Sequence, residues 1–141
     1  MAESLHIYTP TRCHAQRTHG KVLCHGQEQC IVIVTPEGEQ AWNDAFGHAL
    51  PDAQSKAFRM LERLADVRTF FNTEKFVNEG DGIWAIKPVS KIRIYGWYCT
   101  KRRGDFVIGH AAFKNQQKMN PEDRYRVQSI RNLYESKEYP R

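Results

Sequence analysis

The apolar positions in the first half of this 141-residue chain form one short run of consecutive residues and two longer stripes with helical spacing. The β-branched run at residues 30–34 predicts a strand. Apolar residues then recur every three or four positions over 36–50 and again over 52–67, which predicts two helices. Thr35 and Pro36 suit the start of the first helix, because a proline is tolerated in the opening turn. The short connection between the stripes predicts an antiparallel helix pair.

The second half contains shorter apolar runs and one more helical pattern. Three strand-like runs occupy residues 83–87, 91–99 and 106–113. Their short connections predict antiparallel hairpins, and residues 68–82 before them are expected to form an irregular connection. Asn120 and Pro121 open a last helix that extends to about Tyr134. The sequence therefore predicts an α+β fold in the order β-α-α-β-β-β-α, with an antiparallel sheet packed on a two-helix hairpin.

The chain divides into one domain and two flanking segments. Residues 1–29 are polar and rich in histidine, so we expect an N-terminal extension, a domain over 30–135 and a tail over 136–141. The start lacks the features of a secretion signal, and no apolar run approaches the length of a membrane span. Four cysteines without an export signal favour free thiols. We therefore expect a cytoplasmic protein that does not contact the membrane.

Cysteines and histidines gather in the N-terminal segment. The group comprises Cys13, His14, His19, Cys24, His25 and Cys30. Thiolate and imidazole are the usual ligands of zinc, which makes a zinc site one interpretation. However, no pair of these cysteines has the Cys-x-x-Cys spacing of structural zinc sites. The sequence therefore predicts no metal site, and a flexible or partner-ordered extension is the simpler interpretation.

Positive charge is concentrated in one third of the chain. The whole chain carries 21 basic and 16 acidic residues, a formal net charge of +5. Residues 87–131 contain 11 of the basic residues and only three of the acidic ones. Such a surface most often meets polyphosphate, so nucleic acid is the expected partner class. A solvated basic face, or a patch that meets an acidic protein, is the alternative.

The run at residues 91–99 alternates strongly between aliphatic and basic or aromatic residues. Ile92 and Ile94 point to one side of the predicted strand and should pack on the helix pair. The other side carries Lys91, Arg93, Tyr95 and Trp97. Cations and rings on one sheet face suit single-stranded nucleic acid, since rings stack on bases and cations bind phosphates. The alternative is that the last helix covers these rings.

The second half also resembles the RelE/ParE superfamily of bacterial toxins, in its HigB-like, phage-derived branch. Members have a strand G-I-x-E-L-R, a strand Y-R-V, a strand ending in H-x-F-x-K-K and a turn T-x-K-T-P before a helix. The matching segments here are Gly82–Lys87, Lys91–Tyr95 and His110–Pro121. Lys87 replaces the family's arginine and Asn115 replaces its second lysine. The resemblance covers about residues 30–135 and implies a RelE-like fold.

The resemblance also implies an activity and its partners. It implies a type II toxin that cleaves mRNA on the ribosome, with the RNA 2′-hydroxyl as nucleophile. A cognate helix-turn-helix antitoxin would hold the toxin silent, and no small-molecule cofactor would be needed. Because fold does not fix function, two alternatives remain. One is a non-catalytic module of phage origin that binds nucleic acid or a host protein, and the other is a ParE-like toxin that targets gyrase.

The matched positions provide candidate site residues. Arg93 is expected to bind the scissile phosphate, because its planar fork suits bidentate contact with phosphate oxygens. Lys114 and Lys118 are expected to stabilise charge or transfer a proton, and His110 is the acid/base candidate at neutral pH. His110 has the alternative of a hydrogen-bonded core residue. The residues expected to bind the nucleic acid outside the reaction centre are Lys87, Lys91, Tyr95, Arg102 and Arg103.

Overall fold

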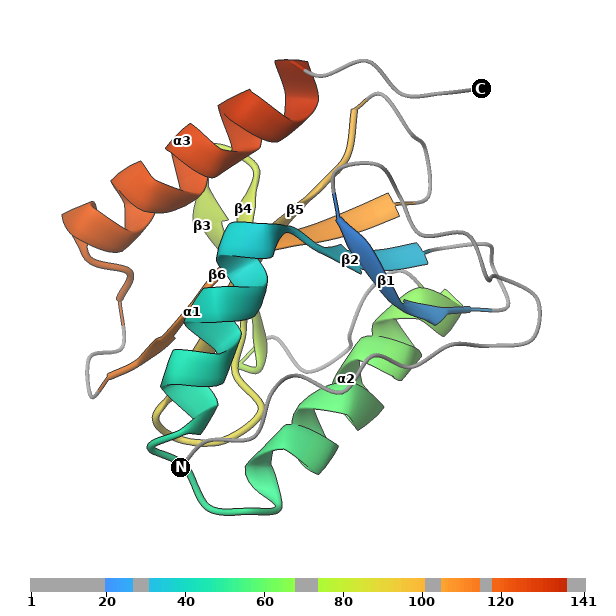
Figure 1. The fold of residues 1–141 in the computed structure, drawn as a ribbon, viewed down its shortest axis with the longest axis vertical. Coiled ribbons are helices and arrows are strands. Elements are labelled where there is room, and N and C mark those ends of the chain that lie inside the picture. The colour runs from blue at the N-terminus through green and yellow to red at the C-terminus, as the bar shows by residue number, and fades with distance from the viewer. Residues whose placement is uncertain (1–19, 27–30, 68–73, 101–104, 115–117, 137–141) are drawn as a thin grey trace.

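The structure is a computed structural model that describes residues 20–26, 31–67, 74–100, 105–114 and 118–136 (Figure 1). These residues form an α+β fold, as predicted, with nine elements. In chain order they are β1 (Lys21–His25), β2 (Ile31–Val34), α1 (Pro36–Phe46), α2 (Ala53–Val67), β3 (Phe76–Gly80), β4 (Ile83–Ile86), β5 (Ile92–Tyr98), β6 (Asp105–Phe113) and α3 (Pro121–Ser136). Among these residues, no helix combines the length and the apolar character needed to cross a bilayer.

The strands form one sheet in the order β1-β2-β6-β5-β4-β3. Every neighbouring pair is antiparallel except β2 and β6, which are parallel and aligned from Ile31–Asp105 to Val34–Ile108. The prediction of a purely antiparallel sheet is therefore wrong at this one pairing. A parallel pair needs a long crossover connection, and everything from α1 to β5 provides it here.

Two strands lie where the sequence pattern predicts none. β1 belongs to the segment expected to be an extension, and it pairs with β2 at one edge of the sheet. β3 belongs to the expected irregular connection and forms the other edge through a hairpin with β4. That hairpin turns at Gly80, Asp81 and Gly82, all with positive φ. Edge strands can form with few buried side chains, and β3 buries only Phe76. The Phe76 ring stacks on the Trp84 ring, with centroids 4.5 Å apart.

Two of the helices begin as the sequence predicts. Thr35 accepts a hydrogen bond at its hydroxyl from the Gly38 N–H at 2.9 Å, and Pro36 follows in the opening turn of α1. Asn120 accepts one at its side-chain oxygen from the Asp123 N–H at 2.8 Å, directly before α3. Each side chain satisfies one of the amide groups that a helix start leaves without an intrahelical partner.

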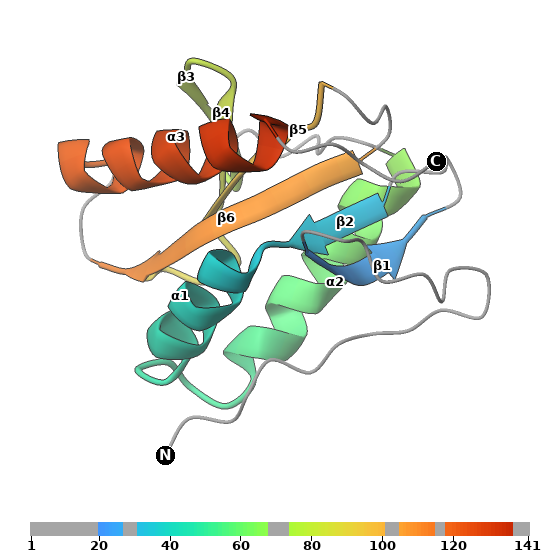
Figure 2. The ribbon, with the colours of Figure 1, turned by 45° about the horizontal axis from the view of Figure 1, so that its top comes forward.

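Helices cover both faces of the sheet (Figure 2). One apolar core joins α1 and α2 to the sheet, and it includes Trp42, Leu61, Leu64, Ile92, Ile94, Phe106 and Ile108. The other core joins α3 to the opposite face, and it includes Tyr95, Trp97, Val107, Val127 and Tyr134. The alternation predicted for β5 is confirmed, because its isoleucines and its aromatic rings lie in different cores.

The predicted exposure of the second face is wrong. Arg93 is only 3% exposed, and Tyr95 and Trp97 are each 1% exposed. The reason is α3, which lies across this face and packs Val127 and Tyr134 against it. The alternative that the last helix covers the rings therefore holds, and the sheet does not present an open basic face to a ligand.

Candidate functional site

A β-bulge brings the acid/base candidate of β6 onto the α3 face. Tyr95 pairs with His110 and Gly96 pairs with Ile108, so Gly109 is the extra residue of β6. Ile108 belongs to the core under α1 and α2, and without the bulge His110 would share that side of the strand. A bulge commonly redirects a side chain in this way. His110 consequently faces Tyr95 and the start of α3.

Four side chains meet at the first turn of α3. Asp123 binds His110 Nε2 through Oδ1 at 2.9 Å and Lys114 Nζ through Oδ2 at 3.2 Å. The Tyr95 ring stacks on the His110 ring, with centroids 5.9 Å apart, and Lys114 Nζ lies 5.8 Å from the Tyr95 centroid. We name these four residues the Asp123 cluster. Each side chain of the two ion pairs is 14% exposed or less, so the cluster is largely shielded from solvent.

The surroundings of the cluster fix the charge of two of its members. Burial raises the pKa of Asp123, but hydrogen bonds from His110 and Lys114 outweigh it and hold that pKa below its usual range. Burial, with the negative charges of Asp123 and Glu79, raises the pKa of Tyr95 well above its usual range. Asp123 is therefore a carboxylate at neutral pH, and Tyr95 is a neutral phenol.

The carboxylate orients the His110 ring. An ionised carboxylate can only accept, so the hydrogen shared with His110 is on Nε2. In the neutral ring this leaves Nδ1 with a lone pair, and Nδ1 is buried with no hydrogen-bond partner among the residues that the structure describes. An aspartate that holds one nitrogen of a histidine so that the other can accept a proton is the arrangement found in hydrolytic triads. The cluster therefore has the parts of a general base.

Arg93 does not present its guanidinium to a ligand in this structure. Its Nη1 donates to the carbonyl of Ser90 at 2.9 Å and to that of Ile92 at 3.1 Å. Its charge reaches the Tyr95 hydroxyl and lowers the pKa of that group slightly against the stronger effect of burial. The expected contact between Arg93 and a scissile phosphate is therefore not supported, and Arg93 is a structural neighbour of the cluster.

The remaining predicted residues are not members of the cluster, and two of them lie outside the described residues. Lys118 is exposed just before α3, and Lys87 is half-buried just after β4. Lys91 is exposed, and its Nζ lies 5.9 Å from the centroid of the Phe113 ring. Arg102 and Arg103 lie outside the described residues. The structure thus unites three of the nine predicted residues in the Asp123 cluster, with Arg93 beside them.

Sequence reasoning missed Asp123. Asp123 follows Asn120 and Pro121 in the sequence, where an acidic residue is common simply because it lies near the positive end of a helix. The available signal was the cap itself, because the Asn120 side chain fixes the backbone of Asp123 and thereby places its carboxylate beside the end of β6. Nothing in the sequence pattern shows which strand residue that carboxylate meets.

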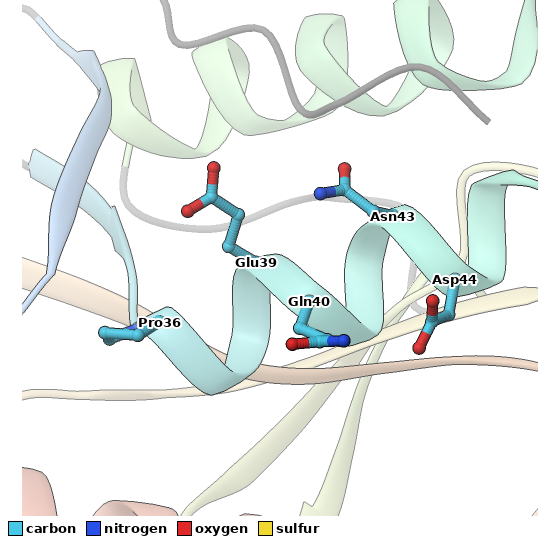
Figure 3. Close-up of a pocket in the computed structure, with 5 residues that line it drawn as sticks. All are labelled: Pro36, Glu39, Gln40, Asn43 and Asp44. Atoms are coloured by element: carbon cyan, nitrogen blue, oxygen red, sulfur yellow. The ribbon is translucent and has the colours of Figure 1, made fainter.

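A depression of about 320 Å³ lies along α1, and its lining includes the carboxylates of Glu39 and Asp44 (Figure 3). Figure 3 shows Glu39 and Asn43 pointing to one side of the helix and Asp44 to another. Glu39 is already paired with Lys21 at 3.0 Å. Two carboxylates repel phosphate, so this surface is not a candidate for nucleic-acid binding.

The described residues offer no preformed metal site. Among them, no group of three or more histidine, cysteine or acidic side chains is placed to hold an ion. Most of the Cys13–Cys30 group lies outside the described residues, so its zinc interpretation is not tested. In comparisons with known proteins, no family model, no curated protein and no solved structure matches the chain.

Proposed function

We propose that the protein is a ribosome-dependent endoribonuclease of RelE-like fold, the toxin of a toxin–antitoxin pair in the cytoplasm. One observation carries the proposal. The sequence predicts Tyr95, His110 and Lys114 as site residues, and in the structure all three meet around one ionised carboxylate. An acid/base group and a cation at one place are parts needed to cleave RNA through its own 2′-hydroxyl.

Three residues of the cluster have a role in this reaction. His110 Nδ1 takes the proton of the 2′-hydroxyl, and the resulting alkoxide attacks phosphorus. The bond from phosphorus to the 5′-oxygen breaks, and that oxygen takes a proton from the Lys114 ammonium. In the closed structure Asp123 fixes His110 as the Nε2–H tautomer, which leaves Nδ1 as the nitrogen that accepts the proton. The products are a 2′,3′-cyclic phosphate and a 5′-hydroxyl, and no metal or cofactor takes part.

The reaction requires the first turn of α3 to move. His110 is buried, and its Nδ1 lies inside the protein in this structure. Lys114 and Asp123 are the members that reach the surface, each with a small exposed fraction. The closed structure is therefore the resting state, and substrate reaches His110 when the Asp123 end of α3 separates from β6.

The test is a brief induction of the protein in bacteria, followed by sequencing of RNA ends. We expect growth arrest and new 5′-hydroxyl ends within messages, with ribosomal RNA intact. His110→Gln keeps a donor for Asp123 but removes the base, and it should lower cleavage by about 100-fold or more. Lys75→Met, at an exposed lysine outside the cluster, is the matched control for Lys114→Met. Full cleavage by both His110→Gln and Lys114→Met would overturn the proposal.

The antitoxin is tested separately. A small helix-turn-helix reading frame beside the gene should, when coexpressed, copurify with the protein and restore growth. Restored growth without a complex would argue against a type II pair.

A second candidate is a non-catalytic RNA-binding module, and the burial of Arg93 and His110 under α3 favours it. Such a module would bind RNA with an affinity that falls as salt rises, and it would leave messages uncut. The same sequencing experiment separates the two candidates.

A further inference from the structure

A pocket that combines aromatic and cationic side chains lies at one end of the sheet. It has a volume of about 250 Å³ and is formed by the α1–α2 connection, the β4–β5 connection and the end of β6. Its lining includes His48, Leu50, Lys56, Ser90, Lys91 and Phe113. We name it the Phe113 pocket. It lies outside the Asp123 cluster and shares no residue with it.

The large apolar side chains of this pocket are partly open to solvent. Phe113 is 39% exposed, and Leu50 beside it is 76% exposed. His48 lies against Phe113 with ring centroids 5.5 Å apart, inclined by 41°. Exposed apolar side chains gathered beside a hollow, unlike single ones, mark an interaction surface, and the Phe113 ring can stack on a planar group there.

The pocket also carries a positive charge. Lys91 forms no ion pair among the described residues, and its Nζ lies over Phe113. Lys56, by contrast, is paired with Asp52 at 3.3 Å, an exposed pair with little effect on stability. Lys91 is therefore the cation that can meet an anion next to a group on Phe113.

The Phe113 pocket and the Asp123 cluster occupy opposite faces at the same end of the sheet. Phe113 and Lys114 are adjacent in sequence and belong to the pocket and the cluster respectively. The Lys114 N–H also donates to the Lys91 carbonyl at 2.8 Å, which holds the two segments together. A single strand of nucleic acid that crosses this end of the sheet would meet both sites, because Phe113 of the pocket and Lys114 of the cluster are consecutive residues.

We propose that the Phe113 pocket binds one unpaired base of a single-stranded RNA, with the neighbouring phosphate on Lys91. This deepens the proposed function, on which the choice of RNA rests. The pocket volume lies just below the usual range of ligand sites and suits a single planar ring system. Any of the four bases can stack on Phe113, because each has a flat aromatic face. A base within a duplex is already stacked between its neighbours and cannot enter the pocket. The pocket therefore selects single strands over duplexes.

The test measures the affinity of the purified protein for fluorescent oligoadenylate by anisotropy. Phe113→Ala should weaken binding by about tenfold, the loss of one base–aromatic stack, and Phe113→Trp should restore it. Tyr125→Ala is the matched control, because Tyr125 is a 74% exposed ring on α3 outside the pocket. Lys91→Gln should reduce the slope of affinity against salt by about one charge. Thermal melting confirms that each variant is folded.

The outcomes distinguish this proposal from the proposed activity. His110→Gln should abolish cleavage and leave the Phe113-dependent affinity unchanged. If RNA binding depends on Phe113 but no cleavage occurs, the proposed endoribonuclease activity is rejected and the proposed base-binding role of the Phe113 pocket is retained. Three results would overturn the proposed base binding. They are an equal loss of RNA affinity for Phe113→Ala and Tyr125→Ala, an equal affinity for single-stranded and duplex RNA, and no RNA binding by the wild-type protein.

Discussion

Asp123 is the residue that ties α3 to the strand beneath it. Its two carboxylate oxygens bind different partners, His110 within β6 and Lys114 just after it. Charge-assisted hydrogen bonds of this kind are about twice as strong as neutral ones, and here they are shielded from solvent. Asp123 therefore has two roles, since it closes the first turn of α3 onto the sheet and orients the ring that the proposed reaction uses.

The depressed pKa of Asp123 predicts how stability depends on pH. A carboxyl group whose pKa is lower in the folded state stabilises the fold above its unfolded pKa, about 3.9, and loses this contribution as the pH falls through the lower folded value. Asp123→Asn should lower the free energy of unfolding by about 1–2 kcal/mol at pH 7, and the difference from wild type should shrink below about pH 4. Urea denaturation across this range measures it.

The control for this prediction is Glu122→Gln, one residue earlier and exposed. It should change the free energy of unfolding by less than about 0.5 kcal/mol at any pH in the series. A difference between wild type and Asp123→Asn that stays constant down to pH 2 would show that the carboxylate is not held as its contacts indicate.

Arg93 provides a second prediction at this scale. Because its guanidinium donates to the Ser90 and Ile92 carbonyls inside the protein, Arg93→Ala should destabilise the fold by about 2 kcal/mol. A phosphate-binding arginine would give the opposite pattern, with weaker RNA binding and an unchanged melting temperature. Melting and RNA anisotropy on the same variant decide between them, and Lys118→Ala, at an exposed cation, is the control for lost charge.

Among the elements, β6 carries the feature that creates the site. The bulge at Gly109 works because glycine leaves room for the Trp97 ring and for α3. A Cβ at this position would lie 2.6 Å from Trp97 Cζ3 and 3.2 Å from Ile130 Cγ2. A strand without this bulge would place His110 on the side of the α1 and α2 helices and leave Asp123 without that partner.

Gly109→Ala should therefore displace Trp97 or α3. We expect a loss of about 1–3 kcal/mol in the free energy of unfolding, the usual effect of overpacking a core. Cleavage should fall as well, because His110 shifts with the strand. Gly47→Ala is the control, since Gly47 is exposed at the end of α1 with an ordinary negative φ of −63°. Equal stability of the two variants would mean that the space around Gly109 is not restrictive.

The elements also show what a sequence can predict. Both helix caps are predictable, since a cap depends on residues within one turn of each other, and the alternation of β5 depends only on neighbours along the strand. The edge strands β1 and β3 are not predictable in this way, because edge strands need little apolar content. The sequence leaves the covering of Tyr95 and Trp97 by α3 as one of two alternatives, because Val127 and Tyr134 show that a helix has an apolar side but not which surface that side meets.

For the molecule as a whole, the contacts between α3 and the sheet determine whether the buried face can open. Its far end is held by Glu135, which accepts hydrogen bonds from Cys99 Sγ at 3.0 Å and from the Thr100 N–H at 2.9 Å. Arg124 and Arg131 bind the β3–β4 turn through Asp81. The Asp123 end is held by the His110 and Lys114 contacts and, one residue later, by the Arg124–Asp81 pair. Opening the buried face at this end therefore requires these charged contacts to break.

Native-state hydrogen exchange tests whether the closed face opens. If the first turn of α3 separates from β6 as the proposed reaction requires, the amides near Asp123 should exchange by local opening, faster than those of β5 and with a weaker dependence on denaturant. Asp123→Asn should accelerate this exchange, while amides near Tyr134, held by Glu135, change less. Exchange of all of α3 together with β5, only through global unfolding, would mean that His110 meets solvent in no folded state, and the protein would then bind RNA without cleaving it.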